Sequence, residues 1–370
     1  MTARRPASLA VLTVALAAVL AGCDREDADY RTTLYVFGTL TEIVVAEHDR
    51  QKAEPALEKI AAGFSRMHRD WHAWKPGELG DLNAAFAGGR AMAVSPLLLG
   101  AIRQAKDFEE RSGGLFNPAI GGLVGLWGFH ADDLPHGAPP AATAIAAWVA
   151  RAPTMADIDI DGATVSSRNA AVRLDFGGFA KGAALDWAAT QLEAAGIADA
   201  VLNAGGGVKV IGRHGNRPWR VAIRDPRGWG VIASVELAPG EALHTSGNYN
   251  RFLEHEGVVY SHILDARTGR PVRDIVSASV IAEDGALADA AATALSVAGP
   301  AEWPAVAAGM GLRYAVLVDG DGTFYMTPDM RARLRIEDGR EHRIVVPDAS
   351  LAGGAAAPQR SASAGMKQSR

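Results

Sequence analysis

The sequence predicts an α+β fold rather than a doubly wound parallel sheet. Helical and strand patterns occur in mixed order instead of alternating regularly. Residues 158–280 show a mostly β pattern, which one clear helix at about 180–195 interrupts. Turns such as Asp161-Gly162 are typical of hairpins. We therefore expect antiparallel β-sheets with packed helices, in one large domain or two intimately joined lobes.

The first part of this domain is predicted to begin with a hairpin and to continue with helices. Residues 34–46 alternate well enough for two short strands around Gly38. Residues 51–69 carry apolar side chains at helical spacing. Residues 96–111 follow an N-cap serine, begin with proline and stop before two glycines, so they form a second helix.

The last part of the domain combines helices with closing strands. A strand over residues 277–282 precedes a helix at 285–298, and a third helix is expected at 303–310. Strands near residues 314–318 and 344–346 complete the domain.

The N-terminus has the features of an export signal. Two arginines precede an apolar stretch at residues 9–20 that is too short to span a bilayer as a mature helix. The stretch closes with Leu20-Ala21-Gly22-Cys23, which resembles the lipobox of bacterial lipoproteins. Cys23 is also the only cysteine in 370 residues, so no disulfide can form within the chain. We expect Cys23 to be acylated, with palmitate among its acyl chains; the alternative is an ordinary cleaved signal with a stray cysteine.

These signals divide the chain into four segments. Residues 1–22 are predicted to be a lipoprotein signal peptide, 23–30 a lipidated tether, 31–348 the folded domain and 349–370 a disordered tail. Loss of the signal removes two basic residues and no acidic ones, which moves the net formal charge from −5 to −7. An acidic chain without a basic cluster is a poor candidate for binding nucleic acid.

Polar side chains suited to phosphate chemistry gather between residues 243 and 293. Ser246 lies beside a glycine turn, and His262 follows an apolar strand. Asp289 and Thr293 are four residues apart and therefore share one helix face. A candidate base, phosphate donors and hard oxygen ligands favour phosphoryl transfer over hydride transfer or peptide hydrolysis.

Each of these residues could instead have a purely structural role. His262 could be a satisfied structural histidine, although its place beside a serine and an aspartate favours a general base. Asp289 could face solvent while Thr293 faces the core. Because their shared face is otherwise apolar and a buried unpaired carboxylate is costly, the sequence favours a Mg²⁺ site.

Two glycine-rich segments could approach a phosphate. Residues 174–182 predict a strand, a glycine turn and a helix with Lys181 in its first turn, where a diphosphate would be stabilised. Residues 202–207 contain three glycines that could form an anion-binding nest. Neither segment matches a Walker A or Rossmann motif, so tight turns remain an open alternative for both.

Read together, these segments resemble the ApbE family, the FAD:protein FMN transferases. The match covers nearly the whole exported domain, in family order. It is carried by Phe37-Gly38-Thr39, by Trp74-Lys75-Pro76-Gly77-Glu78-Leu79 with Asn83, by Phe116-Asn117-Pro118-Ala119 and Leu126-Trp127-Gly128-Phe129, and by the blocks at residues 175–182, 203–206, 245–249, 261–271 and 288–293.

The resemblance implies an ApbE/T-fold-like architecture and an enzyme. It implies Mg²⁺ dependence, with FAD as the donor of FMN to a Thr or Ser hydroxyl and with release of AMP. The acceptors would be exported or membrane redox proteins carrying the target residue. Together with the lipobox, this places the protein, lipid-anchored, at the periplasmic face of the inner membrane.

The resemblance also implies roles for individual residues. Cofactor contacts are assigned to Phe37, Trp74, Leu115, Phe116, Asn117, Asp175, Lys181, Ser246, Gly247 and, through its backbone, Leu264. Mg²⁺ would be ligated by the carbonyl of Gly178 and the side chains of Asp289 and Thr293. His262 would activate the acceptor hydroxyl.

The chain departs from the family pattern at four positions. Phe37 stands where Met is common, which alters ring stacking, and His244 replaces a usual small residue, which makes the pocket tighter or differently charged. Ala266 replaces a proline, and Ala292 stands where some members have an acidic residue. Rival functions for the same pocket are a Mg²⁺-dependent FAD pyrophosphatase and a non-catalytic periplasmic flavin-binding lipoprotein; a scaffold lipoprotein is a weaker one.

Overall fold

The computed structural model of the chain describes residues 29–46, 49–131, 133–249 and 251–347. The predicted signal peptide, the lipidation site Cys23 and the predicted tail from residue 349 lie outside these ranges. The first strand begins at Asp29, two residues before the predicted start of the folded domain at residue 31. Within the described part of the chain, every helix is too short or too polar to cross a membrane.

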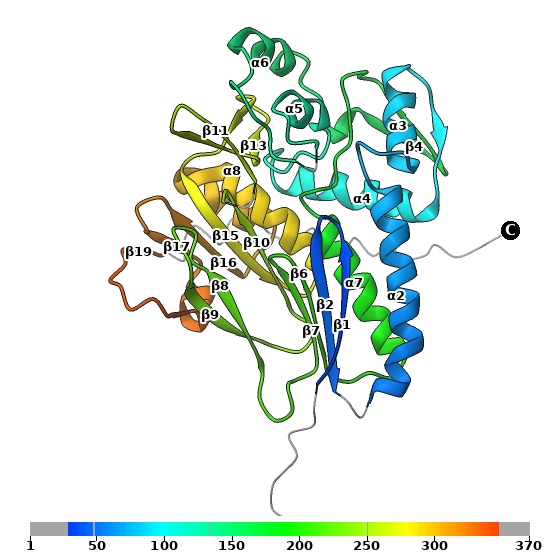
Figure 1. The fold of residues 1–370 in the computed structure, drawn as a ribbon. Helices are drawn as coiled ribbons and strands as arrows, with labels where there is room; N and C mark the ends of the chain where they lie inside the picture. The colour runs from blue at the N-terminus through cyan, green and yellow to red at the C-terminus, as the bar shows by residue number, and fades with distance from the viewer. Residues whose placement is uncertain (1–28, 47–48, 132, 250, 348–370) are drawn as a thin grey trace, which may run out of the picture.

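A nine-stranded sheet forms the centre of the molecule (Figure 1). Its neighbouring strands are antiparallel except for the last pair, β17 and β19. In spatial order the strands are β1 (Asp29–Val36), β2 (Thr39–Ala46), β6 (Ala200–Ala204), β7 (Gly207–Ile211), β10 (Ala242–Gly247), β15 (Ile275–Ala282), β16 (Tyr314–Asp319), β17 (Phe324–Met326) and β19 (Ile344–Val345).

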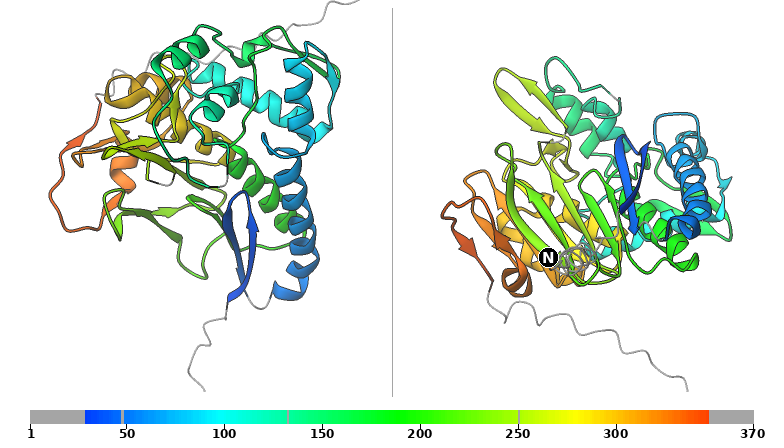
Figure 2. Two further views of the ribbon diagram at one scale, coloured as in Figure 1. Left: turned by 45° about the horizontal axis from the view of Figure 1, so that its top comes forward. Right: turned by 60° about the horizontal axis from the view of Figure 1, so that its bottom comes forward.

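Helices cover one face of this sheet, and a small sheet covers part of the other (Figures 1 and 2). The helices are α2 (Arg50–Asp70), α3 (Glu78–Ala87), α4 (Pro96–Arg111), α5 (Gly121–Leu126), α6 (Ala142–Val149), α7 (Ala180–Ala194), α8 (Gly285–Gly309) and α9 (Pro328–Arg333), with a 3-10 turn at Met155–Asp157. The small sheets pair β18 (Arg335–Ile336) with β9 (Val231–Leu237) and β8 (Trp219–Arg224), β3 (Met92–Ala93) with β5 (Thr164–Ser167) and β4 (Ile158–Asp161), β11 (Phe252–His255) with β12 (Val258–Ser261), and β13 (Leu264–Asp265) with β14 (Arg270–Pro271).

Strand alternation divides the apolar side chains between two cores. On β15, Ala278 and Val280 belong to the core beneath the helices, whereas Ile281 belongs to the core beneath β8 and β9. This is the period-two pattern of a strand that is buried on both faces. It means that consecutive residues of the central strands reach different layers of the molecule.

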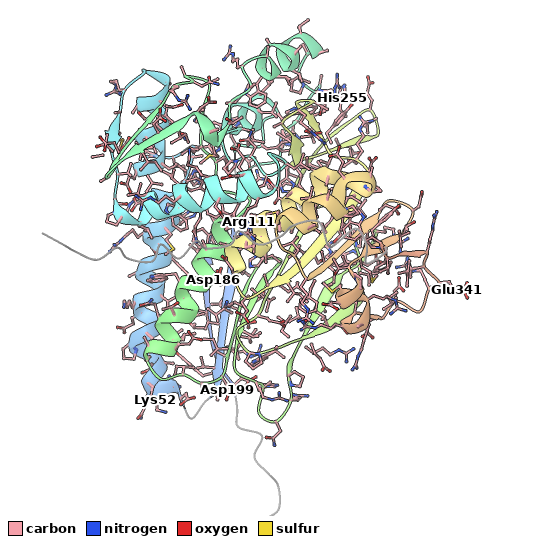
Figure 3. All side chains as sticks on the ribbon, turned by 180° about the vertical axis from the view of Figure 1, so that it is seen from behind. Lys52, Arg111, Asp186, Asp199, His255 and Glu341 are labelled. Carbon is pink, nitrogen blue, oxygen red and sulfur yellow. The ribbon has the colours of Figure 1, made fainter. Side chains whose placement is uncertain are left out.

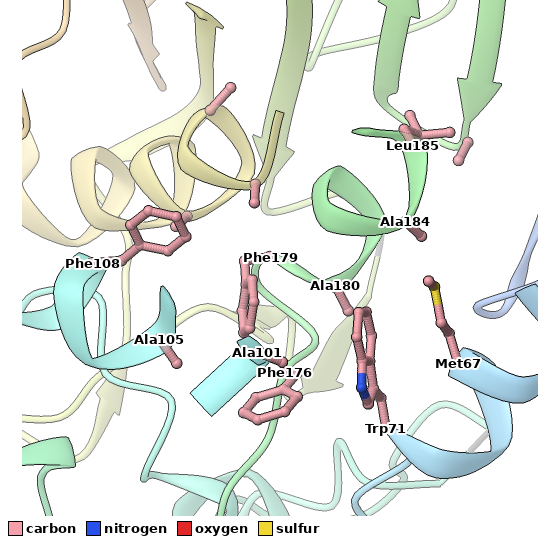
Figure 4. Packing of buried hydrophobic residues seen from close by; sticks show 14 of the residues in the cluster. Met67, Trp71, Ala101, Ala105, Phe108, Phe176, Phe179, Ala180, Ala184 and Leu185 are labelled. Carbon is pink, nitrogen blue, oxygen red and sulfur yellow. The ribbon is translucent and has the colours of Figure 1, made fainter. Parts of the chain in front are cut away.

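The core between the helices fixes the turn that precedes α7. Phe176 and Phe179 lie on this turn with ring centroids 5.0 Å apart, and Phe179 also contacts Phe108 of α4 at 6.0 Å (Figure 4). Trp71 closes the cluster from the end of α2, 6.4 Å from Phe176. Edge-to-face rings of this kind hold their backbone firmly, so the first turn of α7 has a defined position.

Ionic contacts join α7 to the strand and helix beside it. Asp186, on α7, is seen from behind in Figure 3. Its carboxylate forms an ion pair with Lys209 Nζ of β7, with 2.9 Å between Nζ and Oδ1, and its Oδ2 accepts from the Ala286 amide at the start of α8 at 3.1 Å. A carboxylate at a helix N-terminus is favourable, and the Asp186 carboxylate therefore fixes the position of α7 relative to the start of α8.

The predicted α+β class, the opening hairpin and the predicted helices are confirmed. The separate helices predicted at residues 285–298 and 303–310 lie within α8, which consists of two helical segments that meet at a kink, where Gly299 has non-helical backbone angles (φ 63°, ψ −173°). Four short helices, α3, α5, α6 and α9, were not predicted from the sequence. These helices have six to ten residues, too few for a clear 3.6-residue period.

Candidate active site

A cavity of about 1050 Å³ opens beside the hairpin tip of β1 and β2. Of the predicted site residues, Phe37, Lys181 and His262 line it. Its wall also contains the glycine turn of residues 205–206, and Thr245 of β10. Segments that are more than 200 residues apart in the sequence therefore meet around one space large enough for a sizeable ligand.

Phe37 is held at the cavity by the hairpin and by α2. Its backbone has φ 54° and the following Gly38 has φ 72°, which makes the tight turn between β1 and β2. Its ring packs edge-on against Phe64, at 5.8 Å, and its amide donates to His68 Nδ1 at 3.3 Å. An aromatic wall at the cavity edge is thus fixed from two directions.

His262 is oriented through one of its two ring nitrogens. Its Nδ1 lies 3.0 Å from the carbonyl of Arg251, and since a carbonyl only accepts, Nδ1 carries the proton. The lone pair is therefore on Nε2. The pKa of His262 is lowered to about 4, chiefly by burial; the hydrogen bond to the Arg251 carbonyl opposes this shift, and the cations of Lys181 and Arg251 add to it. At neutral pH the ring is a neutral acceptor, as a general base requires.

Asp289 is ionised although it is buried. Its side chain lies on α8 with the residue 4% exposed. Oδ2 accepts from the Gly182 amide, at 3.1 Å, and Oδ1 lies 3.5 Å from His244 Nδ1. Burial alone would raise the pKa of Asp289, but Lys181, His244 and the Gly182 amide together lower it below its usual value. Lys181 thus influences both Asp289 and His262.

Two hydroxyls and a glycine complete an oxygen-rich cluster beside Asp289. Thr293 Oγ1 lies 3.1 Å from Ser246 Oγ. A Cβ added to Gly178 would lie 3.4 Å from Thr293 Oγ1, so the turn before α7 contacts the same helix face. The structure therefore brings together the predicted ligands Gly178, Asp289 and Thr293, and it adds the hydroxyl of Ser246.

This cluster suits a hard cation. Among the described residues, no group of three or more His, Cys, Asp or Glu side chains could hold a metal. The donors at Asp289 are instead one carboxylate, two hydroxyls and the backbone at Gly178. Mg²⁺ binds through one or two protein oxygens when phosphates and water supply the remainder, so these residues fit it. Softer metals that prefer imidazole and thiolate would find a poor set here.

Trp74 and Asp175 form a second pair near the start of α7. Trp74 Nε1 donates to Asp175 Oδ2 at 3.1 Å, and Asp175 Oδ1 accepts from the Gly177 amide at 2.9 Å. The guanidinium of Arg173 lies 3.7 Å from the centre of the Trp74 ring. Asp175 therefore orients both an aromatic side chain and the glycine turn of which Gly178 is part.

Other predicted cofactor residues have structural contacts. Phe116 is 3% exposed and packs beneath Gly178, and Leu115 packs against the same core. The Asn117 side chain donates to the Pro153 carbonyl and accepts from the Ala119 amide, both at 2.9 Å. These side chains shape the turn from below instead of lining the large cavity.

Gly247 and Leu264 are buried beside the cavity. A Cβ on Gly247 would lie 2.4 Å from the Tyr249 ring, and Leu264 packs with Trp127 and Phe129. Two further residues line the cavity without having been predicted as site residues: Arg251, whose carbonyl orients His262, and Tyr249. No local sequence signal marks Arg251, because it acts through its backbone.

The fold and the site together define a class of protein. An α+β domain places a neutral imidazole and a lysine in one cavity, beside an ionised carboxylate with hydroxyl neighbours, and these groups are chemically suited to a phosphate-bearing ligand and an accompanying cation. The chain belongs to the ApbE family, whose family model matches residues 37–317.

Relatives within this family carry one name. The chain is 53% identical over 340 residues to a protein of Rhodobacter capsulatus and 31% identical over 333 residues to one of Klebsiella pneumoniae, both named FAD:protein FMN transferase. The matches cover 91% and 85% of this chain. They cover 65% of the Rhodobacter protein and 94% of the Klebsiella protein, so the chain spans about two thirds of the former.

Solved structures share the fold. The crystal structure of the ApbE protein of Thermotoga maritima matches with a TM-score of 0.74 and 30% identity, over 83% of this chain and 100% of that one. The flavin transferase ApbE of Vibrio cholerae matches with a TM-score of 0.72 and 25% identity, over 83% and 99%. The predicted ApbE-like architecture is therefore confirmed.

Proposed function

We propose that this protein is a Mg²⁺-dependent FAD:protein FMN transferase. In this reaction FMN passes from FAD to a Thr or Ser hydroxyl of an acceptor protein, and AMP is released. The names of the relatives support the reaction class. The observation that carries the proposal is the joint position of Lys181, which faces the cavity of His262 and also influences the buried carboxylate of Asp289.

His262 supplies the base. The acceptor hydroxyl gives its proton to Nε2, and its oxygen forms a bond to the FAD phosphorus that bears the riboflavin. The bond from that phosphorus to the bridging oxygen breaks, and AMP leaves with the electron pair. The Arg251 carbonyl holds the ring in the tautomer that this step needs.

Lys181 and the oxygen cluster beside Asp289 would offset the negative charge of the pyrophosphate. Lys181 lies in the first turn of α7, where helix amides also favour an anion. Mg²⁺, held by Asp289, Thr293 and the Gly178 backbone, would neutralise phosphate charge that otherwise repels the incoming oxygen. The Gly182 amide keeps Asp289 in place from the same helix.

Anchoring by lipid at Cys23 is a further part of the proposal. The lipobox pattern at residues 20–23 supports export and acylation, which would place the domain at the periplasmic face of the inner membrane. There it would meet the flavoprotein subunits of membrane redox complexes. The Cys23→Ser variant should then appear in the soluble periplasmic fraction; a variant that stays in the membrane fraction as the wild type does would contradict lipid anchoring.

One labelling experiment separates the candidate functions. The protein is incubated with FAD and Mg²⁺, with and without a peptide that carries an acceptor threonine. Peptide-linked FMN supports the transferase, whereas free FMN plus AMP that does not depend on the peptide indicates a pyrophosphatase. Unchanged but bound FAD indicates a flavin carrier, and failure to bind any flavin indicates a scaffold lipoprotein. A peptide with valine in place of the threonine is the matched control.

A further inference from the structure

We propose that His244 is a positioning residue that holds the Asp289 carboxylate in the orientation in which it binds the metal. The inference rests on the proposed function only in taking Asp289 as a metal ligand. Its basis is the packing of one imidazole between β7, β10 and α8, and it concerns a residue outside the reacting groups.

The period of β10 places His244 on the helix side of the sheet. Leu243 and Thr245 line the large cavity, so His244 and Ser246 point to the opposite face. On that face lie Asp289 and Thr293, one helical turn apart on α8. Two alternate residues of the strand thus meet two residues of the helix: Ser246 contacts Thr293 at 3.1 Å, and His244 contacts Asp289 at 3.5 Å.

The imidazole of His244 is buried and lacks hydrogen-bond partners among the described residues. The residue is 0% exposed, and neither ring nitrogen has a hydrogen-bond partner among the residues that the structure describes. A buried polar group without a partner is costly. Asp289 Oδ1 lies 3.5 Å from His244 Nδ1, slightly beyond a formed hydrogen bond. A small shift of either side chain closes this distance.

The opposite strand leaves space for this ring. His244 pairs with Gly207 of β7 in the antiparallel register. A Cβ on Gly207 would lie 2.3 Å from His244 Cε1 and 2.6 Å from Nδ1, closer than real carbon contacts allow. Because Gly207 does not have a positive φ, its backbone would accept an alanine. The ring therefore accounts for the glycine at this position.

Each oxygen of the Asp289 carboxylate has one of the two contacts. The Gly182 amide donates to Oδ2, and His244 Nδ1 approaches Oδ1. A carboxylate has about four acceptor directions, so both oxygens retain lone pairs for a cation after these two contacts. Groups that hold a ligating side chain in this way typically change metal affinity by 10- to 100-fold when removed.

The test compares metal binding by folded variants. Calorimetric titration of the FAD-loaded protein with Mg²⁺ gives the Kd for wild type, His244→Leu, His244→Asn and Asp289→Ala. Leucine fills similar volume without a donor, whereas asparagine keeps an N–H near the position of Nδ1. We expect His244→Leu to raise the Kd about tenfold and His244→Asn to stay within about threefold of wild type. Circular dichroism and Tm establish that each variant is folded.

The outcomes distinguish this inference from the proposed function. Weak Mg²⁺ binding by Asp289→Ala together with a wild-type Kd for His244→Leu would overturn the role of His244 and leave the metal site intact. A wild-type Kd for Asp289→Ala would remove the metal site itself, and the inference with it.

Gly207→Ala tests the same role without changing His244, and it serves if His244→Leu does not fold. The added methyl must displace the ring, so the Mg²⁺ Kd should rise several-fold, on the order of the leucine effect. In a His244→Ala background the same methyl has no ring to displace and should change the Kd little. An unaltered Kd in folded Gly207→Ala would contradict the proposal.

Discussion

The protonation of His262 gives the sharpest test of the proposed chemistry. The ring must be neutral to accept the hydroxyl proton, and burial together with Lys181 and Arg251 lowers its pKa from 6.5 to about 4. We therefore expect the rate of FMN transfer to be flat from about pH 5.5 to pH 8 and to fall below pH 5, with a midpoint near 4.

The size of this effect follows from the two pKa values. At pH 6.5 an ordinary histidine is half protonated, whereas a histidine with a pKa of about 4 is protonated in only about one molecule in 300. An ordinary histidine would lose half of the rate at pH 6.5, and this site should lose almost none. Between pH 4 and 6.5 the unfolded chain binds more protons at this residue than the folded protein does, so His262 makes stability rise with pH.

Single-turnover transfer to an acceptor peptide, measured from pH 4 to 8 at saturating FAD and Mg²⁺, provides the assay. His262→Asn can still donate to the Arg251 carbonyl but lacks a basic nitrogen, so it should lose about 10²- to 10⁴-fold in rate while FAD affinity stays nearly unchanged. A rate midpoint near 6.5 would refute the burial argument, and near-normal transfer by His262→Asn would refute the role as base. Circular dichroism at each pH confirms that the protein is folded.

Three further predictions concern the support of the site. Asp289→Ala should weaken both nucleotide binding and turnover, and near-normal transfer across a Mg²⁺ titration would remove it as a ligand. Gly182→Ala places a Cβ 2.1 Å from the Gly285 carbonyl oxygen, which overpacks the contact between α7 and α8. This should lower the free energy of unfolding by about 1–3 kcal/mol, and an unchanged Tm would contradict the prediction. The Asn83 side chain accepts from the Leu174 amide at 2.7 Å and donates to the Leu174 carbonyl at 2.9 Å. Asn83→Ala should therefore lower the free energy of unfolding, measured by urea titration, by about 2–4 kcal/mol. A loss below about 0.5 kcal/mol would show that water replaces these hydrogen bonds.

The sequence predicted the longer helices and the opening hairpin because these depend on local patterns. In α2, apolar residues at helical spacing become the buried face, and Ser95 caps α4 by accepting from the Leu98 amide. The break at Gly299 was visible as a gap between two helical patterns. The structure confirms two helical segments that meet at this residue, but the backbone angles of Gly299 could not be predicted, because they depend on how the second segment packs.

The site shows the same division between local and long-range information. The sequence by itself determined which chemical groups were available: an imidazole at His262, a carboxylate and hydroxyl on one face of α8, and a lysine in the first turn of α7. Only the tertiary structure decided that His244 would face Asp289 and that the Arg251 carbonyl would fix the tautomer of His262. Contacts between separate strands and helices depend on sheet register, and the pKa values of side chains depend on burial. Register and burial are not encoded in the spacing of residues along one segment.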